Sequence, residues 1–151
     1  MKLQITLKDK NQNGFTLIEV LITMAVISLL FFAGYFVSVD SFSRELIISE
    51  HLTLVSVLQK ARNRAMNNIN TSRHGVYIEN DLYIIFRKFP HNSNEPTNEK
   101  IQRNNNINIS GLNEVIFSQL SGESGNTGDI FLDDGMRTKK ITIKKGGLID
   151  W

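Results

Sequence analysis

The sequence predicts an α+β protein in which one long N-terminal helix precedes a domain of antiparallel strands. The twenty residues from Val20 to Val39 contain no formal charge and no proline. As a helix they would span about 30 Å, the thickness of the hydrocarbon core of a bilayer. From residue 73 onwards, alternating polar and apolar residues with short turns replace the helical period. One helix followed by consecutive strands favours a mainly antiparallel sheet.

Positive charge is concentrated before the apolar segment. Residues 1–14 carry three lysines against one aspartate, which accounts for the whole formal net charge of +2. Positive charge marks the end of a membrane segment that stays in the cytoplasm. We therefore expect the C-terminal domain to lie outside the cytoplasm. The chain has no cysteine, which excludes disulfides, thiol catalysis and thiolate metal sites.

The junction between this basic leader and the apolar segment reads GFTLIEVL, residues 14–21. It resembles the signature of type IV prepilins and of the related pseudopilins of type II secretion. The resemblance implies a pilin-like fold and cleavage between Gly14 and Phe15 by a membrane-embedded prepilin peptidase, which also methylates the new N-terminus at Phe15. A secretory signal would be cleaved after the apolar segment, but residues 36–41 match its small-residue pattern poorly. The alternative to a prepilin is an ordinary signal anchor that happens to contain this junction.

Glu19 is the single acid between Gly14 and Val39, a stretch that is otherwise apolar almost throughout. A carboxylate in a membrane segment is costly unless it is paired, and it indicates a function. The resemblance implies that this acid meets the N-terminal amine of a neighbouring subunit in a filament, where it aligns the incoming subunit. In the isolated subunit, the alternative is that Glu19 lies at the cytoplasmic interface of the membrane.

The helical pattern continues beyond the apolar segment. Residues 40–69 contain no glycine or proline, and apolar residues recur at spacings of three and four: Ile48, Leu52, Val55, Leu58, Ala61, Ala65 and Ile69. We predict one helix from Thr16 to Asn68 with this face buried, and with Glu50 among the solvated positions between. The predicted regions are a leader at 1–14, a transmembrane or filament-core half-helix at 15–39, an amphipathic half-helix at 40–70 and a β domain at 73–151.

Within the β domain, period-two runs predict strands at 74–79, 82–87, 107–110, 114–120, 129–132, 139–144 and 148–151. Asn80-Asp81 is a two-residue hairpin turn. The polar stretch from 89 to 106 contains both prolines and is predicted to be a surface loop. The segment from Leu58 to Met66 is similar to the L-x-x-A-R-x-x-A pattern of H-type pseudopilins and FimT-type minor pilins.

The last two predicted strands carry a surplus of basic residues: Arg137, Lys139, Lys140, Lys144 and Lys145. Strand alternation places Lys140, Thr142 and Lys144 on one face, opposite the two isoleucines between them. On a pilus-tip subunit this face would bind DNA phosphates during uptake. We favour the simpler interpretation, a solvated edge strand that its lysines protect from aggregation.

No catalytic constellation is found in the sequence. His51, His74 and His91 are isolated, and His51 falls on the predicted surface of the helix, so all three are interpreted as solvated or satisfied side chains. Asp129, Asp133 and Asp134 lack a calcium-loop register. We therefore expect no enzyme, metal or cofactor.

The predicted function is a structural one. The chain is expected to be a minor pilin or pseudopilin of the bacterial inner membrane, with its partners being prepilin peptidase, the membrane and other pilins. The alternative is a filament-tip module that binds DNA or a secreted substrate.

Overall fold

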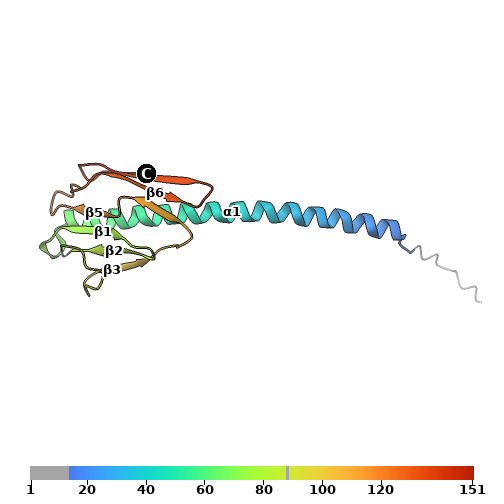
Figure 1. Ribbon diagram of the computed structural model, residues 1–151, viewed down its shortest axis with the longest axis horizontal. Helices are drawn as coiled ribbons and strands as arrows, with labels where there is room; N and C mark the ends of the chain where they lie inside the picture. The colour runs from blue at the N-terminus through green and yellow to red at the C-terminus, as the bar shows by residue number, and fades with distance from the viewer. Residues whose placement is uncertain (1–13, 88) are drawn as a thin grey trace, which may run out of the picture. The chain divides into compact units, whose positions relative to one another are not determined.

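The computed structural model describes residues 14–87 and 89–151 of the chain and, for residues 36–43, the backbone alone. One α-helix, α1, spans Leu17–Met66 and precedes all the described strands. The chain divides into two compact units between Asp40 and Ser41. The first unit contains the apolar part of α1, and the second contains the rest of α1 with the strands (Figure 1). This α+β layout confirms the predicted fold class and is consistent with a pilin-like fold.

The helix ends where asparagines gather in the sequence. Asn68 has φ 54°, and a 3₁₀ turn, η1 (Ile69–Thr71), contains Asn70 with φ 56°. Asparagine adopts this left-handed region more readily than most residues, so it suits the end of a helix. The predicted helix of Thr16 to Asn68 is confirmed to within two residues at each end.

The described strands form two four-stranded sheets in which every pairing is antiparallel. The first sheet has the order β3-β2-β1-β5. Its strands are β1 (His74–Ile78), β2 (Leu82–Phe86), β3 (Glu99–Gln102) and β5 (Glu114–Phe117). The second sheet has the order β4-β6-β7-β8. Its strands are β4 (Asn108–Gly111), β6 (Gly128–Asp133), β7 (Thr138–Ile143) and β8 (Ile149–Asp150).

The division into two sheets corrects the predicted single sheet. Consecutive strands do not always pair, since β4 pairs with β6 and β5 pairs with β1. Alternation in a sequence shows which side of a strand is buried, but it does not identify the partner strand. In the view of Figure 1, β1, β2 and β3 lie on one side of the second half of α1 and β6 lies on the other.

The second half of α1 and both sheets share one hydrophobic core. The fully buried residues of this core come from the helix, the first sheet and the second sheet: Leu54, Leu58, Ala61, Ala65, Val76, Tyr83, Val115, Phe117, Ile130, Leu132 and Ile141. A helix that two sheets cover must bury a wide sector of its surface. The buried sector is therefore wider than the single apolar stripe that the sequence predicts.

The predicted buried face of α1 is confirmed in part, since four of its residues are buried: Val55, Leu58, Ala61 and Ala65. Ile48 and Leu52 were predicted to be buried, but they are 40% and 54% exposed, and Ile69 is exposed as well. Ile47 and Leu54 are buried in their place. The spacing pattern alone does not distinguish these two overlapping faces, and packing against the sheets decides between them.

Glu50 was predicted to be solvated, and this is wrong. Its side chain is buried, at 6% exposure. The hydroxyl of Tyr83 donates a hydrogen bond of 2.5 Å to its Oε1, and the backbone N–H of Asn104 donates one of 3.2 Å to its Oε2. Burial of a carboxyl group is tolerated here because each oxygen has a donor.

The predicted loop at 89–106 contains a strand, β3, which pairs with β2 along the edge of the first sheet. Glu99 anchors this strand to the helix, because its carboxylate lies 2.5 Å from Lys60 Nζ and 2.5 Å from Arg64 NH2. These contacts lie 35 and 39 residues apart in sequence, so local composition carries no sign of them. The Asn80-Asp81 turn is confirmed, since Glu79 N–H donates to the Leu82 carbonyl at 2.9 Å.

Candidate functional site

The predicted cleavage bond lies just before the helix begins. Gly14, Phe15 and Thr16 are not helical, and Phe15 is 83% exposed. The hydroxyl of Thr16 accepts a hydrogen bond of 3.3 Å from the backbone N–H of Glu19 and thus caps α1. The T-x-x-E spacing of these two residues is that of a capping box, a local sequence signal that could have located the helix start. Because the helix begins at Leu17, the Gly14–Phe15 bond lies in non-helical, exposed chain.

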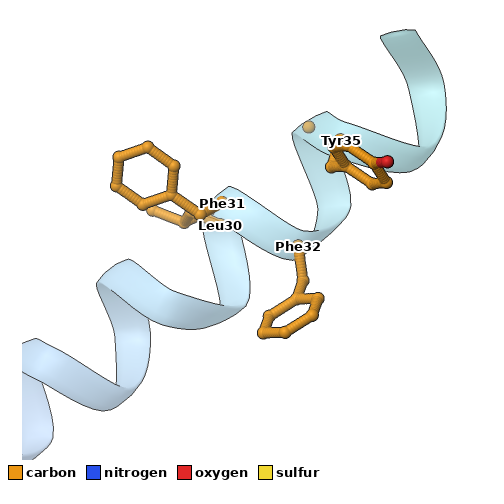
Figure 2. A pocket seen from close by; sticks show the side chains of 5 residues that line it. Leu30, Phe31, Phe32 and Tyr35 are labelled. Atoms are coloured by element: carbon orange, nitrogen blue, oxygen red, sulfur yellow. The ribbon is translucent and has the colours of Figure 1, made fainter. Parts of the chain in front are cut away.

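The apolar part of α1 is exposed along its whole described length. Leu17–Tyr35 is the one described segment that is long and apolar enough to cross a membrane, by length and composition. Its 19 residues would span about 28 Å as a helix. Large side chains project from it into open surroundings, among them Phe31, Phe32 and Tyr35 (Figure 2). An apolar face of this size fits a membrane or a bundle of similar helices.

The two hydroxyl groups of this segment bond to its own backbone. Thr23 Oγ1 donates to the carbonyl of Val20 at 2.9 Å, and Ser28 Oγ donates to that of Met24 at 2.8 Å. Both groups are therefore satisfied without water. In the described part of the chain, no side chain pairs with the carboxylate of Glu19. Glu19 thus remains available for a partner from outside the chain.

The basic residues near the C-terminus lie on and beside β7. Ile141 and Ile143 point into the core, and Lys140 and Thr142 lie on the opposite face, as alternation predicted. However, β7 is paired on both sides, with β6 and with β8. The short strand β8 pairs only with Thr142 and Ile143, so residues 138–141 have no strand on that side in the described part of the chain. The interpretation as a solvated edge holds for these residues and for β8, and not for the end of β7.

Carboxylates balance much of this positive charge. Three of the five basic side chains lie near an aspartate: Arg137 at 3.9 Å from Asp134, Lys140 at 3.9 Å from Asp129, and Lys144 at 3.0 Å from Asp150. Lys139 and Lys145 are exposed. An alternating surface of this kind attracts phosphates less than a continuous basic patch does.

The three histidines lie in different environments. His51 was predicted on the helix surface, but it is 8% exposed, and no hydrogen-bond partner for its Nδ1 is found among the described residues. Burial, assisted by the charge of Lys139, lowers the pKa of His51. His74 is buried with its Nδ1 3.2 Å from the Ser72 carbonyl, and His91 stacks on Tyr77 with ring centroids 4.3 Å apart. In residues 14–87 and 89–151, no group of three or more histidine or acidic side chains is placed to hold a metal ion.

Residues 9–35 match a family model described as the prokaryotic N-terminal methylation motif. The match includes the Gly14–Phe15 bond, Glu19 and the first part of α1, and it leaves the strand-bearing domain outside. Comparisons with curated proteins and with solved structures each find no significant match.

This motif supports a type IV pilin-like precursor, that is, a structural protein. It implies processing by prepilin peptidase and assembly with other pilins. The exposed apolar helix that forms the second part of the motif fits a membrane-anchored pilin.

Proposed function

We propose that this protein is a minor pilin or pseudopilin, a subunit that is stored in the bacterial inner membrane and then assembled into a short filament. The observation that carries the proposal is the coincidence of three features within residues 9–35: a matched methylation motif, a capped helix start and an exposed apolar helix. Prepilin peptidase would remove residues 1–14 and methylate Phe15. The leader would lie in the cytoplasm, and the β domain would lie on the other side of the membrane.

In the proposed filament, the segment 15–39 packs with the same segment of other subunits. Glu19 lies four residues after Phe15, in the first turn of α1. Its carboxylate would form an ion pair with the N-terminal amine of a neighbouring subunit. Pairing offsets the cost of burying both charges away from water, so a subunit in the correct register is favoured over one that leaves either charge unpaired.

The H-type pseudopilin and FimT-type minor pilin group is the part of this family that we propose. The resemblance at residues 58–66 supports it, and the second half of α1 shows why the pattern suits a packed helix. Ala61 and Ala65 are fully buried, while Arg62 between them reaches two loops of the β domain. Small residues on the buried side allow the sheets to approach the helix closely.

The proposed assembly is tested by an experiment that measures cleavage of the chain and its incorporation into filaments separately. In cells that express the cognate filament machinery, Glu19→Gln should be cleaved normally but recovered poorly in sheared filaments. The matched control is Glu45→Gln, which removes the same charge from an exposed position beyond the apolar segment. Normal incorporation of Glu19→Gln would contradict the assembly role of Glu19, whereas a failure of cleavage would contradict the separation of the two steps.

A further inference from the structure

A polar cavity of about 390 Å³ lies between the C-terminal end of α1 and the first sheet. Its lining combines three basic side chains with two neutral polar ones: Arg64, His74, Arg87, Asn70 and Thr97. The volume is within the range of cavities that bind small molecules, and it is much larger than a single ion requires. The site is separate from the processing motif and from β7.

Positive charge exceeds negative charge around this cavity. Arg64 and Arg87 both act on His74, whose pKa is lowered by burial and by these two charges. The nearby acid is Glu99, and its carboxylate lies between Lys60 and Arg64 at 2.5 Å from each. The lining thus has two arginines, Arg64 and Arg87, and no acidic side chain, and Glu99 contacts only the first of them.

Arg87 lines the cavity and makes no stabilising polar contact with the rest of the described chain. It is half-buried at the end of β2, and no hydrogen-bond or ion-pair partner for its guanidinium occurs among residues 14–87 and 89–151. A guanidinium presents five N–H donors in a planar arrangement that fits a carboxylate or a phosphate. Arg64 contributes one nitrogen to Glu99, so it retains other donors.

The same cavity has apolar walls. Ile69, Ile85 and Phe86 line it, and Ile69 is 43% exposed. These side chains offer contact to a ring or a short hydrocarbon chain that extends from an anionic group. A ligand with both parts would bury apolar surface and meet charged donors in one site, which is the usual composition of a small-molecule site.

We propose that the cavity bounded by Arg64, His74 and Arg87 binds a small organic oxyanion, that is, a carboxylate or phosphate group attached to an apolar ring or chain. Arg87 is the main anion-binding residue, Arg64 assists it from α1, and His74 responds to the bound charge. This inference does not depend on the proposed role in a filament.

The test uses the full chain in a nonionic detergent, with its three histidines isotopically labelled on the ring for NMR. Phenyl phosphate and benzoate are titrated separately, and inorganic phosphate and phenol serve as the two partial ligands. We expect saturable shifts of the His74 ring signals, with the pKa of His74 raised by the bound anion, and unchanged signals from His51. Phenyl phosphate and benzoate distinguish a phosphate ligand from a carboxylate ligand. Shifts with phenol alone, or saturable shifts with neither anion, would overturn the proposal.

Variants then identify the binding group. Arg87→Gln should weaken binding at least about tenfold, which is the loss expected when one charged contact of about 1.4 kcal/mol is removed. Arg87→Lys keeps the charge but not the planar donors, so its affinity should lie between those of the original chain and of Arg87→Gln. Lys100→Gln removes an exposed charge from neighbouring β3 and should bind as the original chain does. An equal loss in Lys100→Gln and Arg87→Gln would show general charge attraction and would overturn the assigned site. Unchanged binding by Arg87→Gln, with unchanged His51 signals as evidence of folding, would also overturn it.

Discussion

The Nε–H group of Arg62 donates a hydrogen bond of 3.2 Å to the carbonyl oxygen of Gly122. The same guanidinium reaches the carbonyl of Gly146 at 3.4 Å through its NH2 group. Arg62 therefore joins the last turns of α1 to two loops, one between β5 and β6 and the other between β7 and β8. These loops also contact each other, because Ser124 N–H donates to the Lys145 carbonyl at 3.1 Å. The end of the helix and both sheets are thus held at one junction.

Gly147 tests how tightly this junction is packed. It has φ +73°, and a Cβ atom there would lie 1.9 Å from the Gly122 carbonyl oxygen and 2.9 Å from Arg62 Nε. We predict that Gly147→Ala lowers the free energy of unfolding by about 2–4 kcal/mol, through backbone strain and overpacking. Gly146→Ala is the control, because its Cβ would meet nothing within 4 Å. Thermal unfolding of the two variants, followed by near-ultraviolet circular dichroism, should differ clearly, and equal midpoints would contradict the described packing.

The hydrogen bond from Tyr83 to Glu50 predicts a second stability effect. Tyr83→Phe leaves one oxygen of a buried carboxyl group without its donor, which should cost roughly 1.5–3 kcal/mol. Tyr77→Phe should cost less, since the ring of Tyr77 is half-buried and its stack on His91 is retained. Denaturant unfolding of both variants gives the comparison. If the two losses are equal, the buried bond does not contribute as described.

The same bond predicts loss of stability at high pH. Burial, and then the hydrogen bond and charge of Glu50, raise the pKa of Tyr83 above its ordinary value of 10.0. Tyr83 therefore favours the folded state fully below pH 10.0, and this contribution is lost as the pH rises above that value, because the unfolded chain ionises first. Tyr83→Phe should lack this part of the pH dependence.

His51 predicts a change at low pH. Its pKa lies below the ordinary value of 6.5, since burial and the charge of Lys139 disfavour the protonated ring. The unfolded chain therefore takes up the proton first, and the free energy of unfolding should decrease as the pH falls below 6.5. His51→Leu should reduce that decrease without removing it, because the pKa values of His74 and His91 are also lowered by burial. Unfolding measured between pH 7 and pH 5 checks this, and identical slopes with and without His51 would contradict it.

The arrangement of charges on β7 predicts weak DNA binding. Three of the five basic side chains on and beside β7 lie near aspartates, so few cations remain to release counterions from DNA. We expect filter binding of duplex DNA by the full chain to give no measurable salt-dependent affinity. The DNA-binding alternative would instead be supported by a plot of log K against log salt concentration with a slope of about −0.9 per phosphate contact. Lys139→Gln and Lys145→Gln should then make this slope less steep.

The sequence predicted those elements whose signals are local. The helix boundaries follow from the asparagines at its end and the absence of earlier breakers, and the Asn80-Asp81 turn follows from its two residues. The alternation of Lys140, Ile141, Thr142 and Ile143 correctly placed the two sides of β7. Each of these signals acts within a few residues, where propensity and periodicity decide the structure.

The errors fall where distant residues decide the structure. Strand β3 forms in a polar segment because β2 offers an edge and Lys60 and Arg64 hold Glu99. Glu50 is buried where Tyr83 of the first sheet bonds to it, and His51 is buried near Lys139 of the second sheet. The polar residues of α1 had suggested that both positions were solvated. The oxyanion cavity likewise depends on Arg64 and Arg87, which 22 positions separate in the sequence. No local pattern brings these residues together.

The most direct test of the central claim is the mass of the mature N-terminus, measured on the chain purified from cells that contain a prepilin peptidase. We predict a protein that begins at Phe15 and carries one added methyl group on its N-terminal nitrogen. Substitution of Gly14, whose position leaves open space within 4 Å, should leave the fold intact and abolish the cleavage. A chain that retains Met1, or one that is cut beyond the apolar segment near Ser41, would contradict the account.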